Sequence, residues 1–206
     1  MTAVNLSFAA CGFLGIYHLG AVEAFLRHGD KLLASLRACA GTSAGALVAA
    51  VMLTAPDKVK HCKDFTYKLA TNVRQQRFGA VTPGYNVLLK LREGIEEMLP
   101  ADAHILASDR LHVSLTHFKS GKNHIVSEFK SREDLIKALL ASSCVPIYAG
   151  FQPVDFRGQF SVENIKRLNQ ALFPPSTCRM QSLCQEGFDD AMRFLNREGW
   201  ISSRIE

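Results

Sequence analysis

The stretch Gly41-Thr42-Ser43-Ala44-Gly45 decides the fold of this chain. It follows a short apolar run, residues 36–40, and begins a long apolar run, residues 46–53. A strand that turns directly into a helix presents the central side chain at the apex of a tight elbow. The flanking glycines are expected because strand and helix run so close there that a Cβ would clash. The pattern predicts that Ser43 is a nucleophile, and the alternative is that it only caps an Ala- and Gly-rich helix.

The composition is that of a globular protein that forms a single domain. The 206 residues are 48% hydrophobic and 21% charged, which is enough for one good core. The formal charge of +5 favours anionic surfaces such as phospholipid head groups, but without a basic motif it does not indicate nucleic acid. The six cysteines include no C-x-x-C pair, so we expect neither a zinc site nor a disulfide framework. We also expect no cofactor.

The N-terminal segment does not have the pattern of a secretion signal. It is apolar but has no basic region, and His18 and Glu23 interrupt it early. No run reaches the about 18 uninterrupted apolar residues that a membrane span needs. We therefore expect a reduced protein in the cytoplasm.

A glycine-bearing turn, residues 11–15, precedes the elbow by one strand–turn–helix unit. The strand is predicted over residues 5–10 and the helix over residues 16–26. Backbone amides at such a turn bind anions, either the phosphates of a dinucleotide or the oxyanion of a reaction at the next strand. A dinucleotide site needs a carboxylate about 20 residues further on, near Ser35, and a leading glycine where Ala10 stands. Because both are missing, nucleotide binding is disfavoured.

The segments Ala10–Gly20 and Gly41–Gly45 together resemble the patatin-like phospholipase family, more narrowly its animal branch. The resemblance covers residues 1–159 and resumes from about Asn164 onward. It implies a three-layer α/β/α sandwich that hydrolyses or transfers lipid acyl groups. The machinery of that family is a Ser–Asp dyad with no metal.

The resemblance also assigns roles to residues of this chain. It implies that Ser43 is the nucleophile and that the amides of Gly12, Phe13 and Gly15 form the oxyanion hole. Lipid esters are the implied substrates: acylglycerols, phospholipids or retinyl esters. Attachment to the surface of membranes or lipid droplets is left open.

The middle of the chain alternates between helical patterns and one hairpin. After Pro56 a cationic helix with one apolar face is predicted, either a solvated surface helix or a surface that binds anionic lipid. The other predicted elements are a helix over 87–98, a hairpin of 110–118 with 123–129, and a helix over 131–141. The serines that follow, Ser142 and Ser143, are interpreted as a helix cap without chemistry.

The pattern departs from the family after Gln159. The dyad aspartate of the family stands in an Asp-Gly-Gly or Asp-Gly-Ala turn, and this sequence contains no Asp-Gly dipeptide. The chain reads as a single domain, residues 1–206, with an internal deletion of some tens of residues. Residues 1–159 are the core with both glycine motifs, and residues 160–206 are C-terminal helices, predicted over 162–173 and 180–196.

Three aspartates remain as substitutes for the missing base. Asp155 falls before the expected position, and Asp189 and Asp190 are placed at the start of a helix, where carboxylates commonly pair with the helix dipole. We therefore predict a lipid acyl hydrolase with weak or no activity. The alternative is a non-catalytic remnant that binds lipid or a partner.

Overall fold

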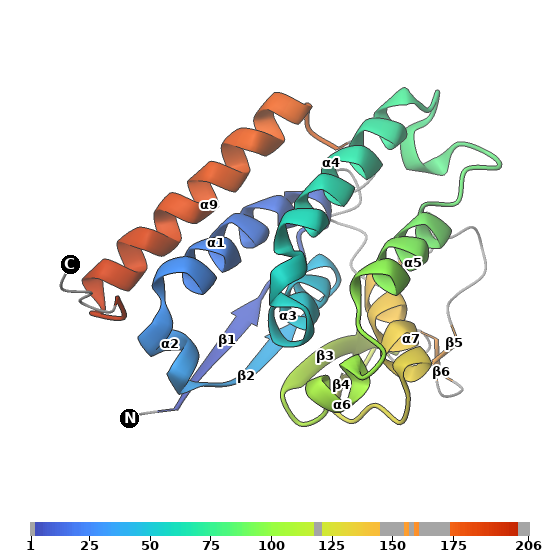
Figure 1. Cartoon of the computed structure of the whole chain (residues 1–206). Helices are drawn as coiled ribbons and strands as arrows, with labels where there is room; N and C mark the ends of the chain where they lie inside the picture. The colour runs from blue at the N-terminus through green and yellow to red at the C-terminus, as the bar shows by residue number, and fades with distance from the viewer. Residues whose placement is uncertain (1–2, 118–120, 145–154, 157–158, 161–173, 202–206) are drawn as a thin grey trace.

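The structure is a computed structural model that describes residues 3–117, 121–144, 155–156, 159–160 and 174–201 (Figure 1). The strands are β1 (Val4–Phe8), β2 (Leu36–Gly41), β3 (Leu111–Thr116), β4 (Asn123–Val126), β5 (Asp155–Phe156) and β6 (Gln159–Phe160). The α-helices are α1 (Gly15–His28), α2 (Asp30–Ser35), α3 (Ala44–Thr54), α4 (Val59–Gln75), α5 (Val87–Met98), α6 (Ala103–Ala107), α7 (Arg132–Ser143) and α9 (Thr177–Arg197). Short 3-10 turns are η1 (Gly12–Leu14), η2 (Pro56–Lys58) and η3 (Gly79–Val81).

The main sheet has four strands in the order β1-β2-β3-β4. The first three strands are parallel, and β4 pairs with β3 antiparallel as the predicted hairpin. Strands β5 and β6 form a separate antiparallel pair. This mixed sheet with its packed helices is consistent with the predicted α/β/α sandwich.

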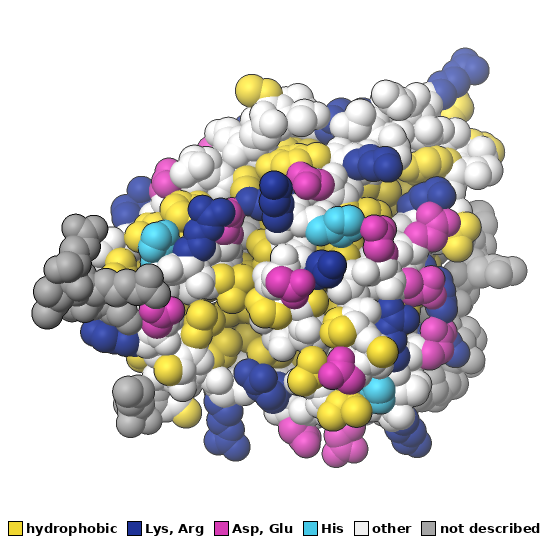
Figure 2. Space-filling view, in the orientation of Figure 1, with side chains coloured by type: hydrophobic (Ala, Val, Ile, Leu, Met, Phe, Trp, Pro, Cys, Tyr) yellow, Lys and Arg dark blue, Asp and Glu magenta, His cyan; other side chains and the backbone are white. Residues whose placement is uncertain are grey.

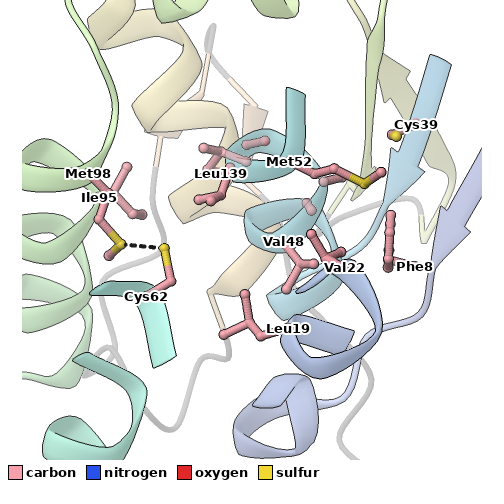
Figure 3. Packing of buried hydrophobic residues seen from close by; sticks show 14 of the residues in the cluster. Phe8, Leu19, Val22, Cys39, Val48, Met52, Cys62, Ile95, Met98 and Leu139 are labelled. Atoms are coloured by element: carbon pink, nitrogen blue, oxygen red, sulfur yellow. Dashed lines mark hydrogen bonds between the residues drawn. The ribbon is translucent and has the colours of Figure 1, made fainter. Parts of the chain in front are cut away.

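Helix α3 lies at the centre of the core. It is apolar on all sides, as expected for a helix with no solvent face. Figure 3 shows its residue Val48 beside Val22 of α1, and its residue Met52 extending toward Cys39 of β2. The long apolar run after the elbow therefore forms the middle of the molecule.

Most predicted elements are confirmed with shifts of one to three residues at their ends. Helix α5 has the predicted bounds, and α7 begins after Ser131, whose side chain accepts a hydrogen bond from the Asp134 N–H. The helix predicted over residues 162–173 lies outside the described residues. Among the described helices, none is long and apolar enough to cross a membrane.

Helix α9 corrects the prediction for two acidic residues. Asp189 and Asp190 were predicted at a helix start, but α9 begins at Thr177, so they lie in its second half. The helix predicted over 180–196 begins three residues earlier, after the N-cap Ser176, whose side chain accepts a hydrogen bond from the Arg179 N–H. Neither carboxylate is therefore a partner of the helix N-terminus.

Helix α9 packs closely against α1 (Figure 1). A Cβ added at Gly187 would lie 2.0 Å from the Tyr17 carbonyl oxygen, and one at Gly20 would lie 1.9 Å from the Cys184 carbonyl oxygen. The two backbones therefore touch at these glycines. The Tyr17 hydroxyl also donates a 2.6 Å hydrogen bond to Asp190, which raises the pKa of Tyr17 to about 12 and lowers that of the Asp190 carboxyl.

We expect Gly187→Ala to destabilise the protein. In an open helix position this change raises stability by about 1 kcal/mol. Here the new methyl group meets the Tyr17 backbone, so the free energy of unfolding should fall by about 1–3 kcal/mol. Urea unfolding followed by circular dichroism measures this. Gln181→Ala on the exposed face of α9 is the control and should be near neutral. A stabilised Gly187→Ala variant would show that the helices do not touch there.

Candidate active site

The sheet brings the two glycine turns to one edge. Because β1 and β2 are parallel neighbours, the segments after both strands leave the sheet at the same end. The Thr42 N–H, just beyond β2, donates a 3.3 Å hydrogen bond to the Phe8 carbonyl oxygen at the end of β1. A Cβ added at Gly15 would lie 3.2 Å from the Cβ of Ala44. The turn before α1 and the elbow before α3 therefore touch.

Ser43 occupies the predicted strand–helix junction in a strained backbone conformation. Its φ is 54° and its ψ is −128°, a region that residues with a side chain seldom adopt. A Cβ at Gly41 would lie 2.5 Å from the Ala46 nitrogen, and one at Gly45 would lie 2.2 Å from the Phe8 carbonyl oxygen. The steric reason predicted for both glycines is therefore confirmed.

The side chain of Ser43 does not cap α3. Ser43 holds the N-cap position, but its hydroxyl makes no capping hydrogen bond. The structure gives this hydroxyl no hydrogen-bond partner among the described residues, and 9% of the residue is exposed. The cap interpretation therefore does not explain the serine.

The turn after β1 offers two backbone amides. Gly12 has φ 55°, and neither its N–H nor that of Phe13 donates a hydrogen bond to a described residue. The Gly15 N–H, in contrast, bonds to the carbonyl oxygens of Gly12 and Phe13 within the turn. Only the first two of the three predicted amides are therefore available to an oxyanion.

His18 holds the start of this turn. Its Nε2 lies 3.2 Å from the Ala9 carbonyl oxygen, and since a carbonyl only accepts, Nε2 carries the proton. The ring also packs edge-on against Phe8 at 5.6 Å, and burial lowers its pKa. This backbone contact satisfies the Nε2 of His18.

Ser142 is a site residue that the sequence did not reveal. Its hydroxyl accepts a 2.8 Å hydrogen bond from the Ser43 N–H and donates a 2.8 Å bond to the Ser114 carbonyl oxygen. Ser142 is 2% exposed and lies inside α7, so it is not the helix cap that was predicted. Two adjacent serines at the end of an apolar helix were the only signal for it. The hydroxyl ties the strained elbow to β3.

Two of the three candidate aspartates have partners other than Ser43. Asp190 is bound to Tyr17 and Arg193, and Asp189 accepts a 2.9 Å bond from Gln185. Asp155 lies in β5, which packs near α7, but its side chain is not among the described parts. No described cluster of three His, Cys, Asp or Glu side chains could ligate a metal.

Comparison with known proteins identifies the chain's relatives. The profile of the patatin-like phospholipase family matches residues 6–168. The Homo sapiens protein named patatin-like phospholipase domain-containing protein 4 is 49% identical over 98% of this chain and 100% of its own length. The alignment spans 252 positions, whereas 98% of this 206-residue chain is about 202 residues, so about 50 positions lack a counterpart here.

A second relative carries a transferase name. The Mus musculus protein named 1-acylglycerol-3-phosphate O-acyltransferase Pnpla3 is 30% identical over 95% of this chain, which spans 59% of its length. Among solved structures, the type III effector protein ExoU matches 93% of this chain and 53% of its own at 15% identity and a TM-score of 0.45. The family match confirms the predicted fold class.

We expect Ser142→Ala to destabilise the elbow. The change leaves the Ser43 N–H and the Ser114 carbonyl without their buried partner, which costs about 1–3 kcal/mol in the free energy of unfolding. The adjacent Ser143→Ala is a matched control, because the buried Ser143 hydroxyl has no hydrogen-bond partner among the described residues. Urea unfolding of both variants measures the difference. Equal stability of the two variants would contradict the role of the Ser142 hydroxyl.

Proposed function

This chain belongs to the patatin-like phospholipase family, and on that basis we propose that Ser43 is a nucleophile for lipid acyl groups. The observation that supports this most is the backbone of Ser43, which has a φ of 54°, while its hydroxyl makes no capping hydrogen bond to α3. Strained residues of this kind cluster at functional sites. The free amides of Gly12 and Phe13 lie in the turn that touches the elbow.

The reaction follows from this arrangement. The Ser43 Oγ attacks the ester carbonyl, its proton passes to a base, and the negative charge on the carbonyl oxygen is stabilised by the Gly12 and Phe13 amides. The leaving alcohol takes a proton, and the acyl group stays on Ser43 as an ester. Water then completes a hydrolysis, or another alcohol completes a transfer, as the name of the mouse relative indicates for that protein.

The substrate class comes from the family. Its members act on lipid esters, so acylglycerols, phospholipids and retinyl esters are the proposed acyl donors. We further propose a cytoplasmic protein that works at a lipid surface, since such esters are concentrated in membranes and droplets. The mild positive charge of the chain favours that location.

The proposed site lacks an identified general base for Ser43. No described carboxylate bonds to the Ser43 hydroxyl, and the about 50 positions missing relative to the human protein favour a deletion that removes the dyad aspartate. We place this deletion after Gln159. The chain would then be a weak hydrolase, or a non-catalytic remnant that binds lipid or a partner. These two functions share the same fold, and they differ in whether a base can take the proton of the Ser43 hydroxyl.

We expect hydrolysis of short-chain p-nitrophenyl esters at or near background, with little further loss on Ser43→Ala. Losing a general base typically costs about 10²–10⁴-fold in rate. Inserting the corresponding human segment after Gln159 should restore turnover, and Ser43→Ala should abolish the restored activity. Release of p-nitrophenolate measures both.

A fluorophosphonate probe, which reacts with activated serines, distinguishes the chain as it stands from the chain with the inserted segment without measuring turnover. The restored chain should label at Ser43, and the chain as it stands should label slowly or not at all. Robust, Ser43-dependent turnover without the insertion would contradict the missing base, and Asp155→Asn would then identify or exclude the substitute.

A further inference from the structure

The positive charge of this chain is concentrated in one segment. Residues 65–92 contain five Lys and Arg residues and no Asp or Glu. Their formal charge of +5 equals that of the whole chain, so the remaining residues are balanced. The segment comprises the second half of α4, the connection to α5 and the first half of α5. The net charge is therefore a local feature of one part of the surface.

Exposed apolar side chains lie at the turn of the same segment. We define the α4–α5 tip as the exposed side chains Arg77, Phe78, Pro83, Leu89 and Lys90. Phe78 is 53% exposed and Leu89 is 51% exposed. The Arg77 guanidinium carbon lies 5.4 Å from the centre of the Phe78 ring, in the geometry of a cation–π contact. An aromatic ring thus stands in water beside a cation.

The connection is held in a defined shape. The Phe78 N–H donates a 3.0 Å hydrogen bond to the Thr82 hydroxyl, which in turn donates a 2.9 Å bond to the Gly79 carbonyl oxygen. Phe78 is therefore presented by a closed turn. Of the two cations, Lys90 is shared with Glu93 at 2.8 Å, whereas Arg77 forms no ion pair with any described carboxylate.

The tip lies at the end of the molecule that carries the candidate active site. Helix α3 leaves the elbow at Ser43, and α4 returns past the level at which α3 begins (Figure 1). At about 1.5 Å per residue, the 17 residues of α4 exceed the 11 of α3 by about 9 Å. Near its end, Arg74 bonds to Thr177 at the start of α9 at 2.7 Å.

The surface over this end has the same composition. Figure 2 shows Lys, Arg and hydrophobic side chains at the upper right corner, above the acidic side chains of the same face. Apolar groups beside exposed cations suit an interface between water and hydrocarbon, where the apolar part enters and the charge stays at the phosphates.

We propose that the α4–α5 tip docks on an anionic phospholipid surface. Phe78 and Leu89 enter the head-group region, while Arg77 and Lys90 bind lipid phosphates. This goes beyond the proposed acyl chemistry, because docking needs neither the Ser43 hydroxyl nor a base. A nucleic acid would use the same cations but not Leu89, and a neutral droplet surface would use the apolar groups but not Arg77.

Vesicle co-sedimentation tests the proposal. The purified chain is mixed with vesicles of phosphatidylcholine alone or with about 30% phosphatidylserine at low salt. We expect the bound fraction to be at least about tenfold higher on the anionic vesicles and to fall as salt screens the phosphates. Arg77→Glu with Phe78→Ser should lower anionic binding at least about tenfold, and Phe78→Ser alone should also weaken it.

Matched controls separate the tip from overall charge and from catalysis. Lys31→Glu with Ile105→Ser makes the same change in charge at exposed positions outside the tip, and it should bind as the unmodified chain does. Ser43→Ala should also bind normally, whether or not Ser43 is a nucleophile. The proposal is wrong if the tip variant still binds, if the control loses as much, or if the chain ignores anionic vesicles and binds an RNA oligonucleotide instead.

Discussion

The close approach of β2 and α3 at the elbow is the constraint on which the rest of the structure depends. Any side chain at Gly41 or Gly45 would overlap backbone atoms. The atom that a side chain at Gly45 would meet is the Phe8 carbonyl oxygen, at the end of β1. The elbow therefore fixes the neighbouring strand as well as its own. With the strand fixed, the turn that follows it brings Gly15 against Ala44, the residue after Ser43. One steric condition thus positions both halves of the candidate site.

Two further contacts hold this arrangement from outside. Ser142 ties the elbow to β3 through its hydroxyl, so the strained backbone has a partner on each side. Helix α9 covers α1 with backbone contact at Gly20 and Gly187, and the Tyr17–Asp190 bond joins the two helices near the first turn. The C-terminal helix therefore supports the unit that carries the turn of Gly12 and Phe13.

Local sequence patterns predicted much of the fold. Each strand and helix up to α7 depends on neighbours in sequence: apolar periodicity, a serine cap, or a pair of glycines around a turn. Each of these patterns spans only a few residues, so it can be recognised without knowing which other helices and strands pack against it. The same holds for the two glycine motifs, whose requirement for missing Cβ atoms is set by the turn itself. The last helix, predicted from residue 180, begins three residues earlier at Thr177 because Ser176 caps it.

The sequence by itself determined that Ser43 sits at a strand–helix elbow and that a glycine turn precedes it by one unit. Only the tertiary structure decided which groups meet there. Ser142 is 99 residues from Ser43, and Asp190 is 173 residues from Tyr17. The tertiary structure also showed that the Gly15 amide is already bonded, while those of Gly12 and Phe13 donate to no described residue. Such pairings follow from how whole elements pack, and no local pattern encodes the distance between two segments that far apart.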